Sequence, residues 1–367
     1  MEKYDKYPEK YPRWYDWKWQ VANRITNEEE LAKVLTLTEE ERADIHLCLT
    51  KFRMAITPYY ASLIRSEDKN DPVRRQCVPS IEETEFCEND LADPLNELGD
   101  SPVPHIVHRY PDRVLFIVTY KCSMYCRHCT RRRAVGEEDQ LICENELKVA
   151  LDYIREHEEI RDVLISGGDP LVMSTERLER IISGIRAIPH VDIVRIGTRV
   201  PVVLPMRITE ELLGMLKKYQ PIWINTHFNH PNEITKDSER ACQMIVEAGI
   251  PLGNQSVLLK GINDHTETMK ELLLKLVHMR VRPYYLYQCD LSQGISHFRT
   301  KVETGVEIMH NLQGNISGYA VPKYVIDAPN GGGKIPINYE YVISRNDKEV
   351  VMENYLGDQY SYPQPPK

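Results

Sequence analysis

The chain has 367 residues, of which 42% are hydrophobic, and its formal net charge is −9. That acidic balance argues against a large surface for nucleic-acid phosphates, and no apolar run reaches the roughly 18 residues that a membrane span needs. The polar residues 1–6 lack the apolar stretch of a secretory signal. Nine cysteines, an odd number, suit a reducing cytoplasm better than a disulfide framework. We therefore expect a cytoplasmic enzyme with no membrane or nucleic-acid partner, and the length permits one α/β barrel with appendages.

The first third of the chain shows no strand pattern. Residues 1 to about 65 have a polar, mostly helical pattern, with Thr38 and Glu41 marking a capped helix start. The segment 67–100 is rich in Asp, Glu, Asn and Pro, which predicts a loop with little regular structure. It contains no motif that indicates a site.

From Val114 onward, short apolar runs alternate with helical patterns. The apolar runs occupy 114–118, 163–165, 193–196, 222–224, 255–259 and 284–287, and the helical patterns lie at 144–154, 175–188, 209–219, 236–248 and 266–279. After the first gap, strands recur roughly every 30 residues, as in the βαβ units of a parallel sheet. Residues that follow strands directly, including Thr198, Arg199 and His227, should meet at one mouth of a barrel.

The end of the chain carries a different pattern. A helix is predicted at about 302–312, and the runs 341–344 and 349–352 indicate a β-hairpin. The proline-rich residues 362–367 are expected to form a loosely held tail.

Three cysteines with the spacing C-x3-C-x2-C follow the first apolar run. They are Cys122, Cys126 and Cys129. A four-iron cluster held by protein sulfur normally takes four cysteines, so three thiolates leave one iron open to a ligand that is not protein. A structural zinc site is the alternative, but zinc prefers four protein ligands, and within the motif only His128 could be the fourth.

Two glycine-rich stretches are candidates for binding a ligand. Residues 166–170, Ser-Gly-Gly-Asp-Pro, follow the second strand and suit either close approach to a ligand or a tight turn. Residues 331–334, Gly-Gly-Gly-Lys, fail the phosphate-loop pattern because Ile335 replaces Ser or Thr and the spacing is wrong. A lysine in such a loop suits Schiff-base formation with an aldehyde cofactor, although a solvated lysine is the plainer interpretation.

The cysteine motif resembles that of the radical S-adenosylmethionine (SAM) enzymes, and the whole pattern resembles the lysine 2,3-aminomutase family. The resemblance runs from about residue 11 to 360 and is dense at 122–133, 165–169, 226–228, 282–299 and 327–334. It implies an α/β fold, a partial (β/α)6 radical SAM barrel at 106–300. An N-terminal helical region, 1–105, would precede the barrel. A small extension, 301–367, would hold the loop with the cofactor-binding lysine, a hairpin and the tail.

The resemblance also implies cofactors and their ligands. A [4Fe–4S] cluster would be held by Cys122, Cys126 and Cys129, with SAM on its open iron and against Gly167, Gly168 and Asp169. Pyridoxal 5′-phosphate (PLP) would be bound covalently by Lys334, with Arg109, Arg113 and Gln255 near it. The substrate carboxylate would bind Arg131, and Asp290 and Asp327 would bind a distal ammonium. In the glutamate-acting branch of the family both of these positions differ from aspartate.

The implied activity is an isomerisation that moves the amino group of L-lysine from C2 to C3 to give β-lysine. The resemblance further implies a small-molecule amino acid substrate, a reductant such as flavodoxin or ferredoxin, and a homo-oligomer. Ornithine, arginine or a protein-bound lysine are alternative substrates. A non-catalytic iron–sulfur protein and a zinc-stabilised interaction module are alternatives of other classes.

The chain departs from the family pattern in three places. Members with a structural zinc carry a C-terminal cysteine cluster, whereas this chain has no cysteine after Cys289. His265 stands where those members have a further zinc ligand, so we predict no structural zinc. Asn330 replaces a glycine in the loop before Lys334, and asparagine tolerates left-handed backbone angles.

Overall fold

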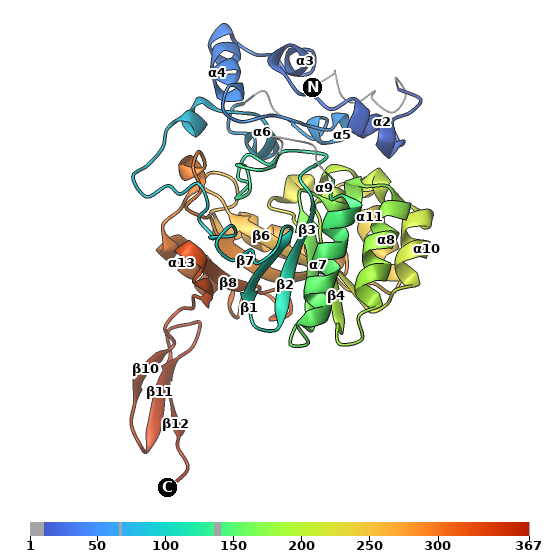
Figure 1. Ribbon diagram of the computed structural model, residues 1–367. Helices are drawn as coiled ribbons and strands as arrows, with labels where there is room; N and C mark the ends of the chain where they lie inside the picture. Colours follow the sequence, from blue (N-terminus) through green and yellow to red (C-terminus); the bar gives the residue numbers. More distant parts are fainter. Residues whose placement is uncertain (1–10, 66–67, 136–140, 367) are drawn as a thin grey trace.

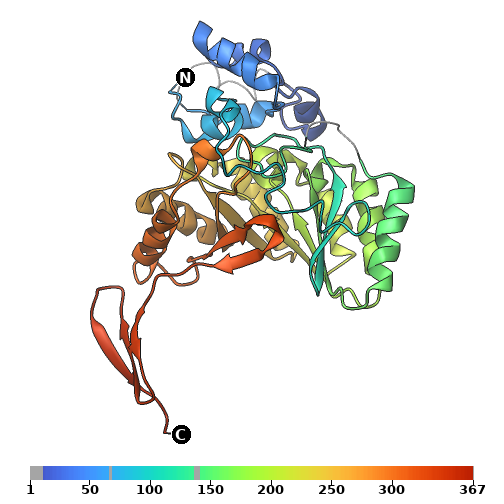
Figure 2. The same ribbon diagram turned by 60° about the vertical axis from the view of Figure 1, so that its left-hand side comes forward.

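The computed structural model describes residues 11–65, 68–135 and 141–366. Its centre is a nine-stranded sheet in which strands β1 to β9 lie side by side in chain order. Helices cover its outer face, short N-terminal helices lie over one end, and a small separate sheet projects from the other (Figures 1 and 2). Among the described residues, no helix has both the length and the apolar character to cross a membrane.

The strands of the large sheet are β1 (Ile106–Tyr110), β2 (Arg113–Thr119), β3 (Asp162–Gly167), β4 (Ile193–Gly197), β5 (Ile222–Thr226), β6 (Leu252–Leu258), β7 (Arg282–Gln288), β8 (Lys323–Ala328) and β9 (Gly333–Pro336). The helices are α2 (Trp17–Ala22), α3 (Glu28–Ala32), α4 (Glu39–Leu49), α5 (Pro58–Ala61), α6 (Pro72–Cys77), α7 (Glu144–Glu156), α8 (Thr175–Arg186), α9 (Val200–Val203), α10 (Glu210–Lys217), α11 (Lys236–Glu247), α12 (Thr266–His278) and α13 (Val302–Leu312).

Strands β2 to β8 are parallel, and β1 and β9 add antiparallel edges. The two edge strands lie close together. The backbone N–H of Lys334 on β9 donates a hydrogen bond to Tyr110 Oη on β1 over 2.9 Å. The barrel is therefore nearly closed. The six predicted strands are present as β2 to β7, each followed by a helix, which confirms the predicted (β/α)6 unit, and β8 with the antiparallel β1 and β9 adds three strands to it.

The helices around the barrel form because their sequences combine caps with an apolar stripe. In α8, Ser174 accepts a hydrogen bond from the backbone N–H of Arg177, and the stripe Leu178, Ile181 and Ile185 is fully buried. Each such stripe packs on the outer face of the sheet, whose strand residues alternate between the helices and the barrel interior. The core of the protein therefore lies between helices and sheet, and the interior of the barrel is left for other groups.

One strand begins earlier than predicted. The run 255–259 is part of β6, which spans Leu252–Leu258. Gly253 and Asn254 have low strand propensity, but the Asn254 side chain is buried and accepts from the Phe228 backbone N–H over 2.7 Å. Tertiary contacts therefore extend the strand where local preference would end it.

Residues 68–100, the described part of the segment predicted to be a loop, are more ordered than their composition predicts. They contain α6 and the 3-10 helix η1 (Ile81–Thr84). Asp71 caps α6 by accepting from the N–H groups of Val73 and Arg74, and Pro72 fills the first helical position, where no N–H is needed. The same residue types that predicted a loop thus act as helix-starting residues.

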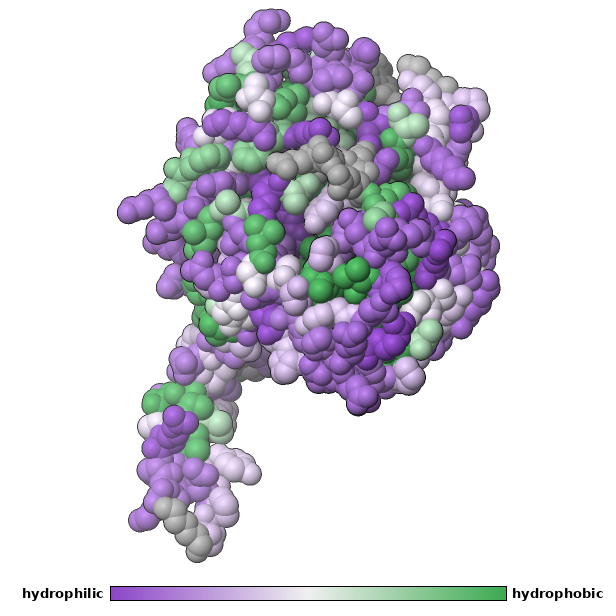
Figure 3. Space-filling view, in the orientation of Figure 1, coloured by the Kyte–Doolittle hydropathy of each residue, from purple (hydrophilic) through white to green (hydrophobic). Residues whose placement is uncertain are grey.

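The C-terminal residues form a three-stranded antiparallel sheet, β10 (Val342–Arg345), β11 (Glu349–Glu353) and β12 (Gln359–Pro363). It confirms the predicted hairpin, but the prediction of a loose tail from 362 is wrong for Tyr362 and Pro363, which pair with β11. Figure 3 shows apolar side chains on this projecting sheet. Its exposed large apolar residues are Val342, Ile343, Tyr355, Leu356, Tyr360 and Tyr362.

Close packing of α13 on β8 gives a test of the fold. A Cβ at Gly305 would lie 2.2 Å from Cζ of the buried Tyr324 ring, whose Oη donates a hydrogen bond to Gln288 Oε1 over 2.6 Å. We expect Gly305→Ala to lower the free energy of unfolding by about 1–3 kcal/mol, measured by denaturant unfolding.

Gly214 in α10 is the matched control, because it is exposed and a Cβ there would meet nothing within 4 Å. Gly214→Ala should raise the free energy of unfolding by up to about 1 kcal/mol through helix propensity. Equal effects of the two substitutions would contradict the packing of α13 on β8.

Candidate active site

A cavity of about 1150 Å³ runs through the barrel. It is lined at one end by residues that follow the carboxyl ends of strands, such as Cys126 and Asp290, and at the other by residues at strand starts, such as Arg113 and Arg282. Its volume lies at or above the upper end of ordinary ligand pockets, which measure about 300–1,000 Å³. The cavity can therefore hold more than one small molecule.

The cysteine loop follows β2, and the N-terminal region holds its backbone. The N–H of Tyr125 donates to the carbonyl of Ala55, and the N–H of Arg127 donates to the carbonyl of Gln76, each over 2.9 Å. The Arg127 guanidinium is buried against the fully buried carboxylate of Glu83, with Nε 2.9 Å from Oε1. The shape of the loop is thus fixed by protein contacts.

Cys122, Cys126 and Cys129 are free and half-buried on this loop. Burial raises the pKa of the Cys122 thiol well above its usual value and that of Cys129 to about 11. In the described part of the chain, no three His, Cys, Asp or Glu side chains are grouped to hold a single metal ion. A cubic iron–sulfur cluster does not require the three sulfurs to meet at one metal ion, because each thiolate binds a different iron.

Polar atoms near this loop lack partners. Over the described residues, the buried side-chain atoms without a hydrogen bond include Ser123 Oγ, His128 Nδ1 and Thr226 Oγ1. Ser123 and His128 belong to the cysteine loop, and Thr226 ends β5 at the same mouth. Because buried polar groups are nearly always paired, these atoms fit a site whose ligand completes the bonding. Burial lowers the pKa of His128 well below its usual range, and the nearby positive charge of Arg199 adds to this.

Gly167 and Gly168 let the end of β3 approach the end of β2. A Cβ on Gly167 would lie 2.3 Å from the Thr119 carbonyl oxygen, and one on Gly168 would lie 2.4 Å from that of Lys121. The Asp169 carboxylate is buried and accepts from Thr198 Oγ1 over 2.7 Å and from the N–H of Arg199 over 2.8 Å. These contacts confirm that the loops after β2, β3 and β4 meet at one mouth.

Three acidic residues of the segment 93–100 pair with arginines of the site. Their pairs are Asp93 with Arg133 at 3.2 Å, Glu97 with Arg131 at 2.7 Å, and Asp100 with Arg109 at 2.8 Å. Burial alone would raise the pKa of Glu97, but Arg131 and Arg133 bring it below its ordinary value. Sequence reasoning missed these residues. The sequence does contain three acidic residues within 93–100 and a run of arginines at 131–133, but neither pattern is a recognised motif that would pair them.

Lys334 lies on the hairpin of β8 and β9, directly opposite Asp327 in register. Its Nζ is 3.0 Å from Asp327 Oδ1, and both residues line the cavity. Asn330 in the preceding turn has a φ of 57°, the left-handed angle expected for this position, and its N–H donates to the carbonyl of Pro94 over 2.9 Å. The lysine thus faces the cavity and is not simply solvated.

Asp290 follows β7 and also lines the cavity. Burial raises its pKa to about 6, the nearby carboxylate of Asp327 adds to the rise, and a hydrogen bond from Thr130 opposes it. That bond joins Thr130 Oγ1 to Asp290 Oδ2 over 2.6 Å. Two carboxylates therefore face one space, where they would stabilise a cation.

Basic groups gather toward the other end of the cavity. The lining there includes the arginines Arg109, Arg113, Arg195 and Arg282, together with the neutral Gln255. Arg113 lies over the Tyr110 ring, with Cζ 3.9 Å from the ring centroid, and its Nη1 is 2.6 Å from Asp112 Oδ1. This end of the cavity suits an anionic group such as a phosphate.

The structure brings most of the predicted site residues to one cavity. Those that line it are Cys126, Cys129, Arg131, Arg109, Arg113, Gln255, Asp290, Asp327 and Lys334. In the glycine-rich stretch Ser166 lines it, whereas the carboxylate of Asp169 is engaged in internal hydrogen bonds. Cys122 lies on the same loop as Cys126, with its carbonyl oxygen accepting from Arg24 Nη1 over 2.5 Å.

Two family models match the chain. Residues 116–273 match the model described as the radical SAM superfamily, and residues 309–367 match a model described as lysine-2,3-aminomutase. Among solved structures, a radical SAM methyltransferase from Sphaerobacter thermophilus is similar over 60% of this chain and 67% of its own, at 15% identity and a TM-score of 0.43. That likeness is too distant to bear on the site.

Known relatives match almost the whole chain. The L-lysine 2,3-aminomutase of Clostridium subterminale is 58% identical over 96% of this chain and 85% of its own length, and that of Acetoanaerobium sticklandii is 57% identical over the same shares. A glutamate 2,3-aminomutase of Clostridioides difficile is 48% identical over 94% of this chain and 81% of its own.

These matches confirm the resemblance found in the sequence. Membership of the superfamily implies a [4Fe–4S] cluster with SAM, and the aminomutase family is PLP-dependent. The free cysteines, the unpaired polar atoms beside them and the cavity with its lysine fit these groups. This chain belongs to the lysine 2,3-aminomutase family of radical SAM isomerases.

Proposed function

We propose that the protein moves the amino group of L-lysine from C2 to C3 to give β-lysine. The observation that carries this proposal is the arrangement of charges in the cavity, where Asp290 and Asp327 face the same space as Lys334 and Arg131. A lysine substrate has one carboxylate and a distal ammonium, so it needs one cation and one acidic pair. The lining of the cavity offers both.

The proposal assigns the cofactor groups as follows. Cys122, Cys126 and Cys129 would hold the cluster, Gly167, Gly168 and Asp169 would shape the loop against SAM, and Lys334 would hold PLP with Arg109, Arg113 and Gln255 near it. Bound there, SAM on the reduced cluster would supply radical chemistry, and PLP would supply an aldehyde that can take up the substrate amino group. The basic end of the cavity supports the phosphate assignment.

Arg131 would bind the substrate carboxylate. One edge of its guanidinium is paired with Glu97, with Nε 2.8 Å and Nη2 2.7 Å from Oε1. Such a pair fixes the plane of the guanidinium, so that a further N–H can meet a carboxylate in a set direction. Glu97 is therefore a positioning residue for Arg131.

Asp290 and Asp327 would select a cationic side chain. A buried ammonium needs opposite charge nearby, whereas the carboxylate of glutamate would be repelled by both aspartates in a medium of low dielectric constant. Asp327 would also bind Lys334 when that lysine carries no cofactor. Lys334 Nζ is 3.0 Å from Asp327 Oδ1.

The proposal extends to partners and location. A small electron-transfer protein of the flavodoxin or ferredoxin type would supply the electron. The projecting sheet β10–β12 exposes Val342, Ile343 and Tyr360, which supports a homo-oligomer that covers them. All nine cysteines are unpaired, as suits the cytoplasm.

The proposal is tested by an anaerobic assay with SAM, PLP, dithionite and free amino acids, read by mass spectrometry and NMR. We expect nitrogen to appear at C3 of lysine, with turnover of glutamate lower by at least about 100-fold, since two repulsive carboxylates face its side chain. Conversion of ornithine or arginine but not lysine would assign a different cationic substrate. No conversion of any amino acid by protein with an intact cluster would favour a non-catalytic iron–sulfur protein.

Lys334→Ala tests the cofactor assignment. We expect loss of the visible absorbance band of lysine-bound PLP and a fall in kcat on the order of 10³-fold or more, since residues that act as one catalytic unit are not replaced by their neighbours. Lys323→Ala is the matched control, because Lys323 is an exposed lysine at the start of β8. A retained band in Lys334→Ala would contradict the assignment.

Asp290 gives a pH dependence with a definite sign. Its pKa is raised to about 6, so it becomes protonated, and loses its attraction for the substrate ammonium, as the pH falls through about 6. We expect the KM for lysine to rise by up to about tenfold per pH unit below that value. In Asp290→Asn the KM should be higher by about 10–100-fold at neutral pH, and this rise at acidic pH should disappear. An unchanged pH profile in the variant would assign the rise to another group.

A further inference from the structure

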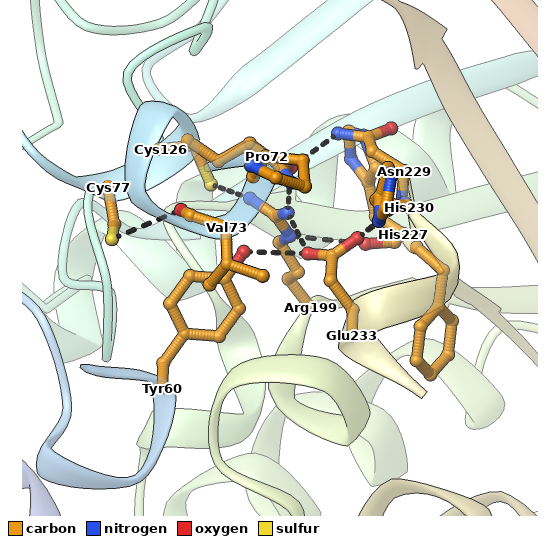
Figure 4. Close-up of polar contacts among 12 residues, drawn as sticks. Tyr60, Pro72, Val73, Cys77, Cys126, Arg199, His227, Asn229, His230 and Glu233 are labelled. Carbon is orange, nitrogen blue, oxygen red and sulfur yellow. Dashed lines mark hydrogen bonds and ion pairs between the residues drawn. The ribbon is translucent and has the colours of Figure 1, made fainter. Parts of the chain in front are cut away.

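Arg199 lies at the mouth of the barrel and contacts the cysteine loop. It follows β4 and is 7% exposed, and its Nη1 is 2.8 Å from the sulfur of Cys126 (Figure 4). Neither the composition of the loop nor its cysteine spacing assigns a role to this contact. Cys126 is one of the three cysteines of the motif, so Arg199 bonds to the sulfur of a cluster ligand.

The rest of the Arg199 side chain is held on all sides. Its Nη2 is 2.7 Å from Glu233 Oε1 and 2.6 Å from Gln76 Oε1, and its Nε donates to the carbonyl of His227 over 3.1 Å. A guanidinium has five N–H donors, and these contacts with the one to Cys126 use four of them. The side chain therefore has little freedom to turn away from the sulfur.

Glu233 keeps the charge of Arg199 in place. It is fully buried, and its Oε1 also accepts from Tyr60 Oη over 2.7 Å. Its Oε2 accepts from the backbone N–H groups of Asn229 and His230 over 2.6 and 2.8 Å (Figure 4). Both oxygens of the carboxylate are therefore fixed by hydrogen bonds. The ion pair is oriented, with its positive end toward the sulfur and its negative end away from it.

Two of the supporting residues come from the N-terminal region. Gln76 lies on α6 and Tyr60 on α5. The Gln76 carbonyl also accepts from the N–H of Arg127, which follows Cys126 in the loop. One short helix thus holds both the backbone beside Cys126 and the guanidinium that meets its sulfur.

We infer that Arg199 is a positioning residue that raises the reduction potential of the cluster through its hydrogen bond to Cys126, and that the N-terminal region holds it there. This inference rests on the proposed cluster at Cys122, Cys126 and Cys129. Reduction adds one electron from an external electron-transfer protein to the [4Fe–4S]²⁺ form and gives [4Fe–4S]⁺, with no proton taken up. Hydrogen bonds and positive charge at the sulfurs stabilise the form with more negative charge, which is the reduced one.

The test compares Arg199→Gln, Arg199→Lys and the parent protein after anaerobic reconstitution. Iron and sulfide content is measured first, and the midpoint potential is then found by redox titration, followed by the electron paramagnetic resonance signal of the reduced cluster. We expect a lower midpoint potential in Arg199→Gln and a smaller lowering in Arg199→Lys, which keeps the charge but not the geometry.

Arg207→Gln is the matched control. Arg207 is 1% exposed, and its Nε and Nη2 donate to the carbonyls of Leu171 and Met173 over 2.8 and 3.1 Å. We expect its loss to leave the potential unchanged. A shift in Arg207→Gln as large as that in Arg199→Gln would overturn the inference, because any lost buried arginine would then have the same effect.

Two further outcomes are decisive. If both Arg199 variants assemble a full cluster with the parent's potential and only SAM binding is weakened, Arg199 contacts the ligand and the inference is wrong. If Arg199→Gln does not assemble a cluster, the potential of Arg199→Lys decides, and an unchanged value overturns the inference. Absence of iron and sulfide in the parent protein would instead show that the proposed function itself has failed.

Discussion

The buried carboxylate of Glu83 is the contact on which the site depends. It is 0% exposed and pairs with both Arg127 and Arg132 of the cysteine loop. Burial alone would raise its pKa, but the two arginines bring it below the ordinary value. Removing one partner of such a pair leaves uncompensated buried charge, at a cost of about 3–5 kcal/mol. Packing of the N-terminal region against the loop therefore stabilises the shape of the loop.

The same principle organises the cavity. Acidic residues of the segment 93–100 hold two arginines of the cavity in place, because Arg109 pairs with Asp100 and Arg131 shares Glu97 with Arg133. With these two guanidinium groups paired to acidic residues, Asp290 and Asp327 line the cavity without forming ion pairs to them. Burial raises the pKa of Asp290 and the nearby carboxylate of Asp327 adds to the rise, so an added positive charge would stabilise its ionised form. An ammonium supplied by a ligand can provide that charge.

Local pattern predicts some of this and non-local contact decides the rest. The strands and helices from β2 to α12 follow from apolar periodicity, and the cysteine spacing points to the loop because three thiolates within eight residues have few other uses. Glu83 and Glu97 could not be found in this way, since their meaning comes from arginines more than 30 residues away. Edge strand β1 was missed for a similar reason: its pairing with β2, rather than its own sequence, makes it a strand.

The residues that line the cavity come both from inside and from outside the range that matches the superfamily model. The superfamily model covers 116–273, which includes the three cysteines, Gly167 and Arg199. Arg109, Asp290, Asp327 and Lys334 lie outside that range. They line the same cavity because β1, β7, β8 and β9 complete the barrel on either side of the shared strands. Residues of the strands that close the barrel therefore share one cavity with the cysteine loop, and Gln76 of the N-terminal region contacts both the backbone of that loop at Arg127 and the side chain of Arg199.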